Sequence, residues 1–393
     1  MNARSHKMQK ALVSGMALLA AATFSANSVS AATGDWPQYG FTAKGDRDNT
    51  QETILSRKTV PHLVRKWSAN IQNVLSGAVV ANGIVYVCSY DGHLYARDAK
   101  TGAPVWQAAT GGNIYSSPAV AEGLVYLGSG DGRVYAFDAE TGAQRWSVSI
   151  NGSVVTALVV ADGVIYSGTN TGFALAIDAK TGIIKWSTEV RPHGMLSAPA
   201  VAHGIAYFNS FNDYNGLDAL DIRTGAVLWQ QPLDNLSSHL GVPAVYRDLV
   251  ITRSDSFISA FDAKTGQSRW FVHTVDIMGS IAIAGGHVFA AGPVYLWSYD
   301  AATGKYQYGN YVGSDTDETP ALANGVVYLG KEPSGREAAT ISAFDWDNGK
   351  LLWQAPTAGG VWAPPTVSNG MLYVSSGGIT SGSGIEFTAY GLP

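Results

Sequence analysis

The alternation of apolar and polar residues along the chain predicts short β-strands arranged in a repeated unit. Residues 116–146, SSPAVAEGLVYLGSGDGRVYAFDAETGAQRW, divide into four such strands, at 116–121, 124–129, 133–138 and 144–147. The turn between the second and third strands contains Asp131-Gly132. An Asp-Gly pair between alternating apolar residues favours a tight hairpin, because the primed turn needs positive φ angles. The pattern therefore indicates antiparallel hairpins, and it recurs along nearly the whole chain.

Two residue types recur at intervals of roughly 40 residues, a period that with four strands per repeat is typical of propeller blades. An Asp closes the third strand of each repeat: Asp98, Asp138, Asp178, Asp221, Asp262, Asp300 and Asp345. A Trp lies in the fourth strand, with Tyr308 in its place in one repeat: Trp106, Trp146, Trp186, Trp229, Trp270 and Trp353.

The two ends of the chain predict the number of blades. An isolated Trp-containing strand at 63–69 precedes the first full repeat, and 364–390 supplies three strands without a Trp strand. Joining them gives an all-β, eight-bladed propeller of four-stranded blades over residues 62–393, closed by N-terminal and C-terminal strands. Closure of this kind removes exposed sheet edges. A seven-bladed ring with a loose end is the alternative.

Composition and charge narrow the class of protein. The 393 residues are 46% hydrophobic and 14% charged, with 45 Gly, which suits one large all-β domain. The net charge is −5 and no basic run follows the N-terminus, so nucleic acid is not expected as a partner. We also expect no membrane span in residues 32–393, and a monomer.

Residues 1–31 have the features of a secretory signal. Arg4, Lys7 and Lys10 precede an apolar stretch at 11–26, and small residues at 29–31 form a cleavage site. A membrane anchor is the alternative, although the stretch is short and rich in Ala, Ser and Thr. Cys88 is the only cysteine, so we expect neither a disulfide nor lipid attachment. The prediction is an exported protein, periplasmic or extracellular, that is not a lipoprotein.

Residues 32–61 carry no blade pattern and are predicted to run as a strap over the ring. The motif WPQYG (36–40), followed by Asn49-Thr50, Ile54 and Trp67, resembles the entry segment of PQQ-dependent quinoprotein dehydrogenases. The repeats resemble the PQQ-type propeller repeat that these enzymes share with the outer-membrane barrel-assembly lipoprotein. For the enzymes, the resemblance implies PQQ with a calcium ion, a stacking Trp, two adjacent cysteines and a catalytic Asp. One cysteine cannot supply that pair, and no segment reproduces the catalytic Asp context.

The repeated Trp and Asp residues are interpreted as structural. A Trp at one position in most blades predicts packing of one blade on the next through a large buried area. Stacking on a planar cofactor is the alternative. The repeated Asp and Thr-Gly indicate turns, in which the carboxylate accepts from backbone N–H groups and Gly takes positive φ.

Departures from the repeat indicate where function is expected. The two largest insertions, 332–338 and 377–384, belong to adjacent blades and to one face, and such loops often carry binding. The residue ahead of each inner strand is predicted to line the channel mouth on that face: Val74, Tyr115, Val154, Leu196, Leu240, Met278, Asp317 and Trp362.

One sector of this ring combines carboxylates, cations and an aromatic ring. The predicted ligand-binding residues are Tyr115, His239, Asp317, Glu318, Lys331, Arg336 and Trp362. Asp315, Asp317 and Glu318 form a candidate metal site, because hard cations such as Ca²⁺ take oxygen ligands. A solvated acidic loop at 314–318 and a surface position for His239 are the alternatives. The loop at 212–215 is a second location for the site.

Two functions remain open from the sequence. In the first, the protein is a non-catalytic exported propeller that binds a small molecule, glycan or protein at the channel mouth. In the second, suggested by the resemblance, it is a quinoprotein dehydrogenase that uses PQQ and Ca²⁺ to oxidise an alcohol or sugar.

Overall fold

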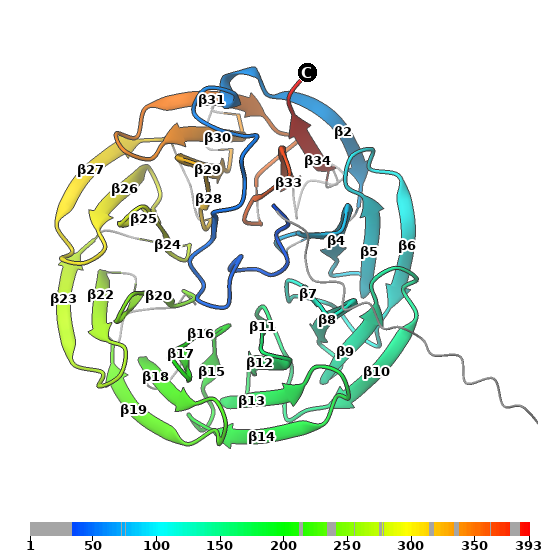
Figure 1. Ribbon diagram of the computed structural model, residues 1–393, viewed down its shortest axis with the longest axis vertical. Helices are drawn as coiled ribbons and strands as arrows, with labels where there is room; N and C mark the ends of the chain where they lie inside the picture. The colour runs from blue at the N-terminus through cyan, green and yellow to red at the C-terminus, as the bar shows by residue number, and fades with distance from the viewer. Residues whose placement is uncertain are drawn as a thin grey trace, which may run out of the picture.

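The protein is a ring of eight blades around a central axis, each with four antiparallel strands, as the computed structural model shows (Figure 1). Two of the blades have a fifth, two-residue strand. The structure describes residues 34–71, 73–74, 76–211, 215–233, 241–254, 256–274, 277, 279–313, 318–333, 338–361, 363–377 and 386–393. The predicted signal at 1–31 lies outside these residues. No helix in the described part of the chain is long and apolar enough to cross a membrane.

The first four blades follow the chain in order. Blade 1 contains β3 (Val79–Ala81), β4 (Ile84–Cys88), β5 (His93–Asp98) and β6 (Pro104–Ala109). Blade 2 contains β7 (Ala119–Ala121), β8 (Leu124–Ser129), β9 (Arg133–Asp138) and β10 (Gln144–Ser149). Blade 3 contains β11 (Val159–Ala161), β12 (Val164–Gly168), β13 (Phe173–Asp178) and β14 (Ile184–Glu189). Blade 4 contains β15 (Met195–Leu196), β16 (Ala200–Ala202), β17 (Ile205–Phe211), β18 (Gly216–Asp221) and β19 (Val227–Pro232).

The other four blades complete the ring. Blade 5 contains β20 (Ala244–Tyr246), β21 (Leu249–Arg253), β22 (Phe257–Asp262) and β23 (Ser268–His273). Blade 6 contains β24 (Ala282–Ala284), β25 (His287–Ala291), β26 (Tyr295–Asp300) and β27 (Tyr306–Tyr311). Blade 7 contains β28 (Ala321–Ala323), β29 (Val326–Lys331), β30 (Thr340–Asp345) and β31 (Leu351–Pro356), with β1 (Asp48–Asn49) on β28. Blade 8 contains β32 (Thr366–Ser368), β33 (Met371–Ser376), β34 (Glu386–Gly391) and β2 (Val64–Asn70), which follows a 3-10 turn (Val60–His62).

Blade 8 joins the two ends of the chain. Its strand order is β2-β34-β33-β32, so the N-terminal strand β2 forms the outer edge of a sheet whose other three strands are C-terminal. Trp67 pairs with Ala389 in the antiparallel register of β2 and β34. The predicted eight-bladed, all-β propeller is therefore confirmed, and the seven-bladed alternative is wrong.

The repeated Trp residues link each blade to the next at the outer strands. Six indole Nε1–H groups donate to a backbone carbonyl of the following blade at 2.8–3.2 Å, from Trp67, Trp106, Trp146, Trp186, Trp229 and Trp353. The ring also covers the turn glycine of that blade. A Cβ on Gly142 would lie only 2.6 Å from the Trp106 ring. The structural interpretation of the repeated Trp thus agrees with these contacts. The turn residue that the indole ring covers must be glycine, because a side chain there would collide with the ring.

The repeated Asp residues organise the turn between the third and fourth strands. In blade 2, Asp138 Oδ1 accepts hydrogen bonds from the backbone N–H and the hydroxyl of Thr141, at 2.9 and 2.8 Å. Hydrogen bonds and the charge of Arg145 lower the pKa of Asp138 to about 2 against the opposing effect of burial. Blades 1, 3, 4, 5 and 6 repeat the Asp–Thr pair. The carboxylates are therefore turn residues and not metal ligands.

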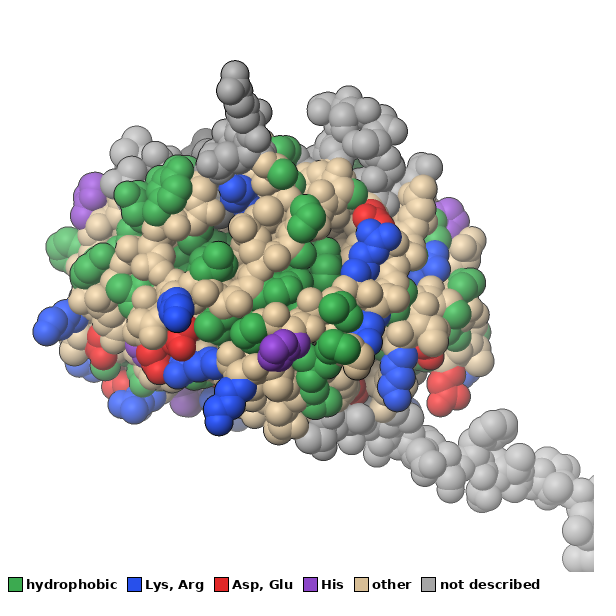
Figure 2. All heavy atoms as spheres, turned by 90° about the horizontal axis from the view of Figure 1, so that it is seen from above, with side chains coloured by type: hydrophobic (Ala, Val, Ile, Leu, Met, Phe, Trp, Pro, Cys, Tyr) green, Lys and Arg blue, Asp and Glu red, His purple; other side chains and the backbone are tan. Residues whose placement is uncertain are grey.

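The ring has two distinct faces. We call "turn face" the one with the turns between first and second strands and between third and fourth strands, such as Asn82-Gly83 and 99–103. The "loop face" carries the turns between second and third strands and the connections to the next blade. Exposed Lys100, Glu140 and Lys180 lie in turns of the turn face. Seen edge-on in Figure 2, charged side chains gather toward one face of the disc, with hydrophobic side chains along the rim.

Residues 34–62, the strap, pass along the inside of the ring and contact the inner strand of every blade in turn (Figure 1). The contact is always with the middle residue of the three-residue strand, from Val80 in blade 1 to Val367 in blade 8. In blades 2, 4, 5, 6 and 7 that residue donates its N–H to a strap carbonyl at 2.6–2.9 Å. In blade 3, Val160 donates to the Gln38 side chain. The strap thus pairs the inner edges of the sheets, which otherwise present unpaired backbone groups.

Two strap carboxylates lie on either side of Arg47. Burial raises the pKa of Asp46 to about 6, although Thr42 donates a hydrogen bond to it at 2.8 Å. Burial and the charge of Asp46 raise the pKa of Asp48 to about 7. The fold therefore favours the protonated form of both groups, and ionising them opposes the seating of the strap.

We expect Trp146→Phe to destabilise the protein by about 1 kcal/mol more than Trp270→Phe. Both indoles cover a turn glycine, but Trp146 donates to Ala179 O, whereas the buried Nε1 of Trp270 has no acceptor among the described residues. Urea unfolding of both variants measures the difference. Equal losses would show that packing alone links the blades.

We expect the free energy of unfolding to fall between about pH 4 and pH 7 in a way that Asp46→Asn/Asp48→Asn abolishes. Between the ordinary carboxyl pKa of 3.8 and the raised values, the folded protein binds more protons than the unfolded chain. Its stability therefore decreases as the pH rises through this window, by about 1.4 kcal/mol per unit of pKa shift for each group. Parallel pH profiles for the wild type and the double variant would contradict this.

Candidate functional site

In the connection that leads from one blade to the inner strand of the next, two adjacent residues have different exposure to solvent. One is buried and the other lies at the surface of the loop face. Val74 and Val154, which were expected at the channel mouth, are buried (1% and 0% exposed), whereas the expected Tyr115 is 39% exposed. Val155, next to Val154, is half-buried on the loop face. Because successive residues of an extended chain point to opposite sides, a shift of one residue exchanges the two environments. The predicted mouth ring therefore mixed two positions, and the expectation was wrong for Val74, Val154 and the fully buried Leu196.

The buried position is a wedge between neighbouring blades. A Cβ on Gly128 would lie 2.2 Å from Cβ of Val154, and one on Gly330 would lie 2.3 Å from Val361. The second strands of blades 2, 3 and 7 thus need a small residue where the wedge of the next connection packs. Cys88 occupies this small-residue position in β4 and is fully buried. Burial raises the pKa of its thiol, so it packs as a small hydrophobic side chain.

Strap side chains fill the centre of the channel. The Arg47 guanidinium is 2% exposed and donates to the carbonyls of Tyr39, Pro320 and Pro365. It lies over the rings of Trp36 and Tyr39, at 5.3 and 4.7 Å from their centroids. The Tyr39 hydroxyl contacts Thr319 Oγ1 at 3.1 Å. The structure therefore has a cation held between two aromatic rings where the eight blades converge.

Few members of the predicted carboxylate and cation sector can be placed. Asp315, Asp317, Arg336, Trp362 and His239 lie outside the described residues. Glu318 and Lys331 both belong to blade 7: Glu318 is half-buried ahead of β28, and Lys331 is buried at the end of β29. Burial lowers the pKa of Arg47, and the charges of Tyr39 and Glu318 act in the opposite direction. Tyr115 lies between blades 1 and 2, so the structure separates it from Glu318 and Lys331.

Tyr115 lines a cavity of about 500 Å³ on the loop face, between the connections and turns of blades 2 and 3. Asn113, Asp131, Ser153 and Asn170 also line it. Asp131 is held in place, because it accepts from the hydroxyl of Tyr135 and the N–H of Gly111. Asn170 Oδ1 accepts from the N–H of Ser153 at 2.8 Å, which leaves its amide nitrogen without a partner among the described residues. The cavity thus combines an aromatic ring with fixed polar groups.

Tyr90 extends this surface and was missed in the sequence. Its ring is 38% exposed and packs edge-on against Tyr115, with centroids 5.1 Å apart. A hydrogen bond to Tyr115 raises the pKa of Tyr90. Tyr90 replaces Gly130 and Asn170 of the following blades in the turn between second and third strands. This departure from the repeat was the signal that could have found it.

The described residues do not fit a calcium–PQQ centre of the kind that the resemblance implies. Ca²⁺ takes six to eight oxygen ligands, but no three His, Cys, Asp or Glu side chains among the described residues are grouped to hold a metal ion. The centre of the channel instead contains the cation Arg47, which disfavours a second cation nearby. The buried Cys88 packs in the apolar cluster between blades 1 and 2.

Comparison with known proteins gives two kinds of match. The family model described as outer membrane protein assembly factor BamB matches residues 48–159 and 254–336. The quinohemoprotein alcohol dehydrogenase of Comamonas testosteroni is 30% identical over 197 residues, which cover 47% of this chain and 28% of the relative. The dehydrogenase subunit of the quinone-type alcohol dehydrogenase of Gluconobacter oxydans (strain 621H) is 32% identical over 184 residues, covering 38% and 24%. The chain spans about a quarter of the length of the curated relatives it matches.

Solved structures match over most of the ring. The C. testosteroni enzyme has a TM-score of 0.78 at 17% identity, covering 92% of this chain and 81% of that one. A europium-containing methanol dehydrogenase has a TM-score of 0.79 at 15% identity, covering 92% and 98%. BamB from Moraxella catarrhalis has a TM-score of 0.69 at 18% identity, covering 84% and 100%. At these identities the likeness concerns the fold, which enzymes and an assembly factor share.

Proposed function

Since this chain belongs to the PQQ-type β-propeller repeat family, we propose that it is an exported binding protein whose loop face takes a glycan or a similar polyhydroxylated small molecule. One observation carries the proposal: the exposed Tyr115 ring beside a cavity lined by fixed amide, carboxylate and hydroxyl groups. A tyrosine offers a rigid apolar face for the ring of a sugar. Convergent polar groups then fix its orientation through the hydroxyls.

The positions of the polar groups support this ligand class. Asp131 and Asn170 are tied to the backbone by the hydrogen bonds described above, so little side-chain entropy is lost when they accept or donate to a ligand. Glu318 and Lys331, in blade 7, belong to the same proposal as a second part of the loop face. Export rests on the signal-like residues 1–31 and agrees with a family model described as an outer membrane protein assembly factor.

Binding of a linear oligosaccharide should raise the melting temperature, because a ligand of the folded state alone stabilises it. We expect Tyr115→Ala to weaken binding by about tenfold, or ~1.4 kcal/mol, with little change in melting because the side chain is exposed. Tyr295→Ala is the matched control, since Tyr295 is 40% exposed on blade 6. Calorimetric titration measures both. Equal affinities in the two variants would move the site away from Tyr115.

Quinone-dependent oxidation of an alcohol is the second candidate function. Both curated relatives are named as alcohol dehydrogenases of the quinone type, and they favour this function more than a binding protein. It would require PQQ and a divalent or trivalent metal ion, for which the described residues offer no grouped ligands. The comparisons therefore favour a dehydrogenase, whereas the geometry of the described residues favours a binding protein. An experiment can decide between these two functions.

If the protein only binds its ligand, PQQ with Ca²⁺ should leave the melting temperature unchanged, and ethanol should not reduce an added dye. Both measurements use the whole mature chain, with a lanthanide ion in a parallel sample. A rise in melting temperature together with alcohol-dependent dye reduction would overturn the binding proposal and establish the dehydrogenase.

A further inference from the structure

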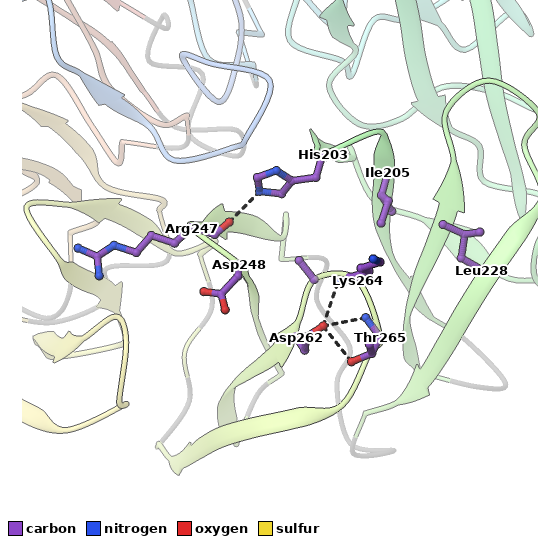
Figure 3. Close-up of a pocket in the computed structure, with 9 residues that line it drawn as sticks. His203, Ile205, Leu228, Arg247, Asp248, Asp262, Lys264 and Thr265 are labelled. Atoms are coloured by element: carbon purple, nitrogen blue, oxygen red, sulfur yellow. Dashed lines mark hydrogen bonds between the residues drawn. The ribbon is translucent and has the colours of Figure 1, made fainter.

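A second cavity lies on the turn face, between blades 4 and 5, and no feature of the proposed function uses it. Its volume is about 920 Å³. In Figure 3, His203 and Ile205 come from one side and the 262–265 turn from the other, with Leu228 on the outer strand β19. Ile205, Leu228 and Ala263 supply apolar surface, while His203, Arg247 and Lys264 are exposed. The cavity is thus apolar inside, and its rim carries both cations and the carboxylates Asp248 and Asp262.

The apolar wall includes an outer-strand position that is charged in blades 2, 3 and 5 and apolar in blades 1, 4 and 7. In blades 2, 3 and 5, the residue before the outer-strand Trp is a cation that pairs with the Asp of its own blade: Arg145 with Asp138, Lys185 with Asp178, and Arg269 with Asp262. In blade 4 the same position holds Leu228, which is 49% exposed. Blade 4 therefore has a short apolar side chain where blades 2, 3 and 5 have a long cationic one.

The rim contains a departure from the repeat, in the turn of blade 5. In the other seven blades, the turn between first and second strands has Gly at its second position, with φ between +71° and +87°: Gly83, Gly123, Gly163, Gly204, Gly286, Gly325 and Gly370. Blade 5 has Arg247-Asp248 instead. His203 Nε2 contacts Arg247 O at 2.7 Å, which ties the turns of blades 4 and 5 together at the cavity. Two basic residues thus meet at this edge.

Of the charged groups at the cavity, Asp262 is already paired, which leaves the cations Lys264 and Arg247 against the single carboxylate Asp248. Asp262 already accepts from Thr265 and pairs with Arg269. The hydrogen bond to Asp262, together with the charges of Asp262 and Asp248, raises the pKa of Arg269. Neither Lys264 nor Arg247 forms an ion pair with a carboxylate in the part of the chain that the structure describes. Figure 3 shows the Lys264 amine on the side of Ile205 and Leu228, whereas the Arg247 guanidinium extends away from them.

We propose that this cavity binds an amphipathic monocarboxylate, with its hydrocarbon or aromatic body against Ile205, Leu228 and Ala263 and its carboxylate at Lys264. Burial of an apolar body supplies most of the binding free energy in such cavities. A compact ammonium at the rim can pair with one carboxylate while remaining solvated. His203, joined to Arg247, lies beside the same opening. The site is on the opposite face from Tyr115 and is independent of the function proposed there.

Calorimetric titration of the mature protein with octanoate, kept below its micellar range, tests the proposal. We expect saturable binding that Leu228→Arg weakens by at least about tenfold, because this change restores the residue of blades 2 and 5 and fills the cavity. Lys264→Gln should weaken octanoate binding about threefold or more and should leave binding of 1-octanol unchanged. The matched controls are Val105→Arg, at the same outer-strand position in blade 1, and Lys180→Gln, at the same turn position in blade 3.

The proposal is wrong if octanoate does not bind, or if Leu228→Arg and Val105→Arg have the same effect on its affinity. Equal binding of octanoate and 1-octanol in the wild type would show an apolar cavity without carboxylate recognition, which also contradicts it. Both substituted positions are exposed, and other blades carry the introduced Arg, so the variants are expected to fold with unchanged melting temperatures.

Discussion

Hydrogen bonds between the strap and the inner strands are the constraint on which the centre of this ring depends. Each blade has a short inner strand whose free edge faces the channel, and an unpaired backbone group there costs free energy when it is buried. One segment, Trp36 to Asn49, contacts all eight of these strands in order. The same segment also places Arg47 in the channel. One segment therefore both pairs the inner strand edges and fills the channel.

At the outer circumference, neighbouring blades are joined by a different contact, which is repeated from blade to blade. Most of the outer-strand Trp residues cover the turn glycine of the next blade and donate to its backbone, and β2 completes blade 8 so that these contacts continue around the whole ring. The contacts inside the ring are more demanding. Burying the Arg47 guanidinium costs desolvation free energy, so its N–H donors must be satisfied by backbone carbonyls. The outer contacts tolerate variation: Tyr308 replaces one Trp and donates to Trp346 O.

The two candidate sites share a physical origin, since both arise where the blades differ at single positions. Tyr90 replaces a small or polar turn residue and places an aromatic ring beside Tyr115 on the loop face. Leu228 replaces a cation and opens an apolar wall on the turn face. Identical blades would offer eight equivalent, shallow grooves. Substitution at single positions makes one groove unlike its neighbours without altering the hydrogen bonds that hold the ring.

The sequence by itself determined the blade, the blade number and the closure by β2, because strand alternation, Asp-Thr-Gly turns and a repeat near 40 residues are local patterns. It also identified Tyr115 as a residue of the loop face. Only the tertiary structure decided which of two adjacent residues is a wedge: Val154 is buried and Val155 lines a cavity, a difference set by packing against the next blade. It alone showed the strap inside the ring, since that path depends on contacts far apart in the chain. The cavity beside Leu228 is likewise formed by residues from two blades, about 20 to 60 positions apart in the chain. A local sequence pattern cannot predict it, because it depends on how the two blades lie side by side.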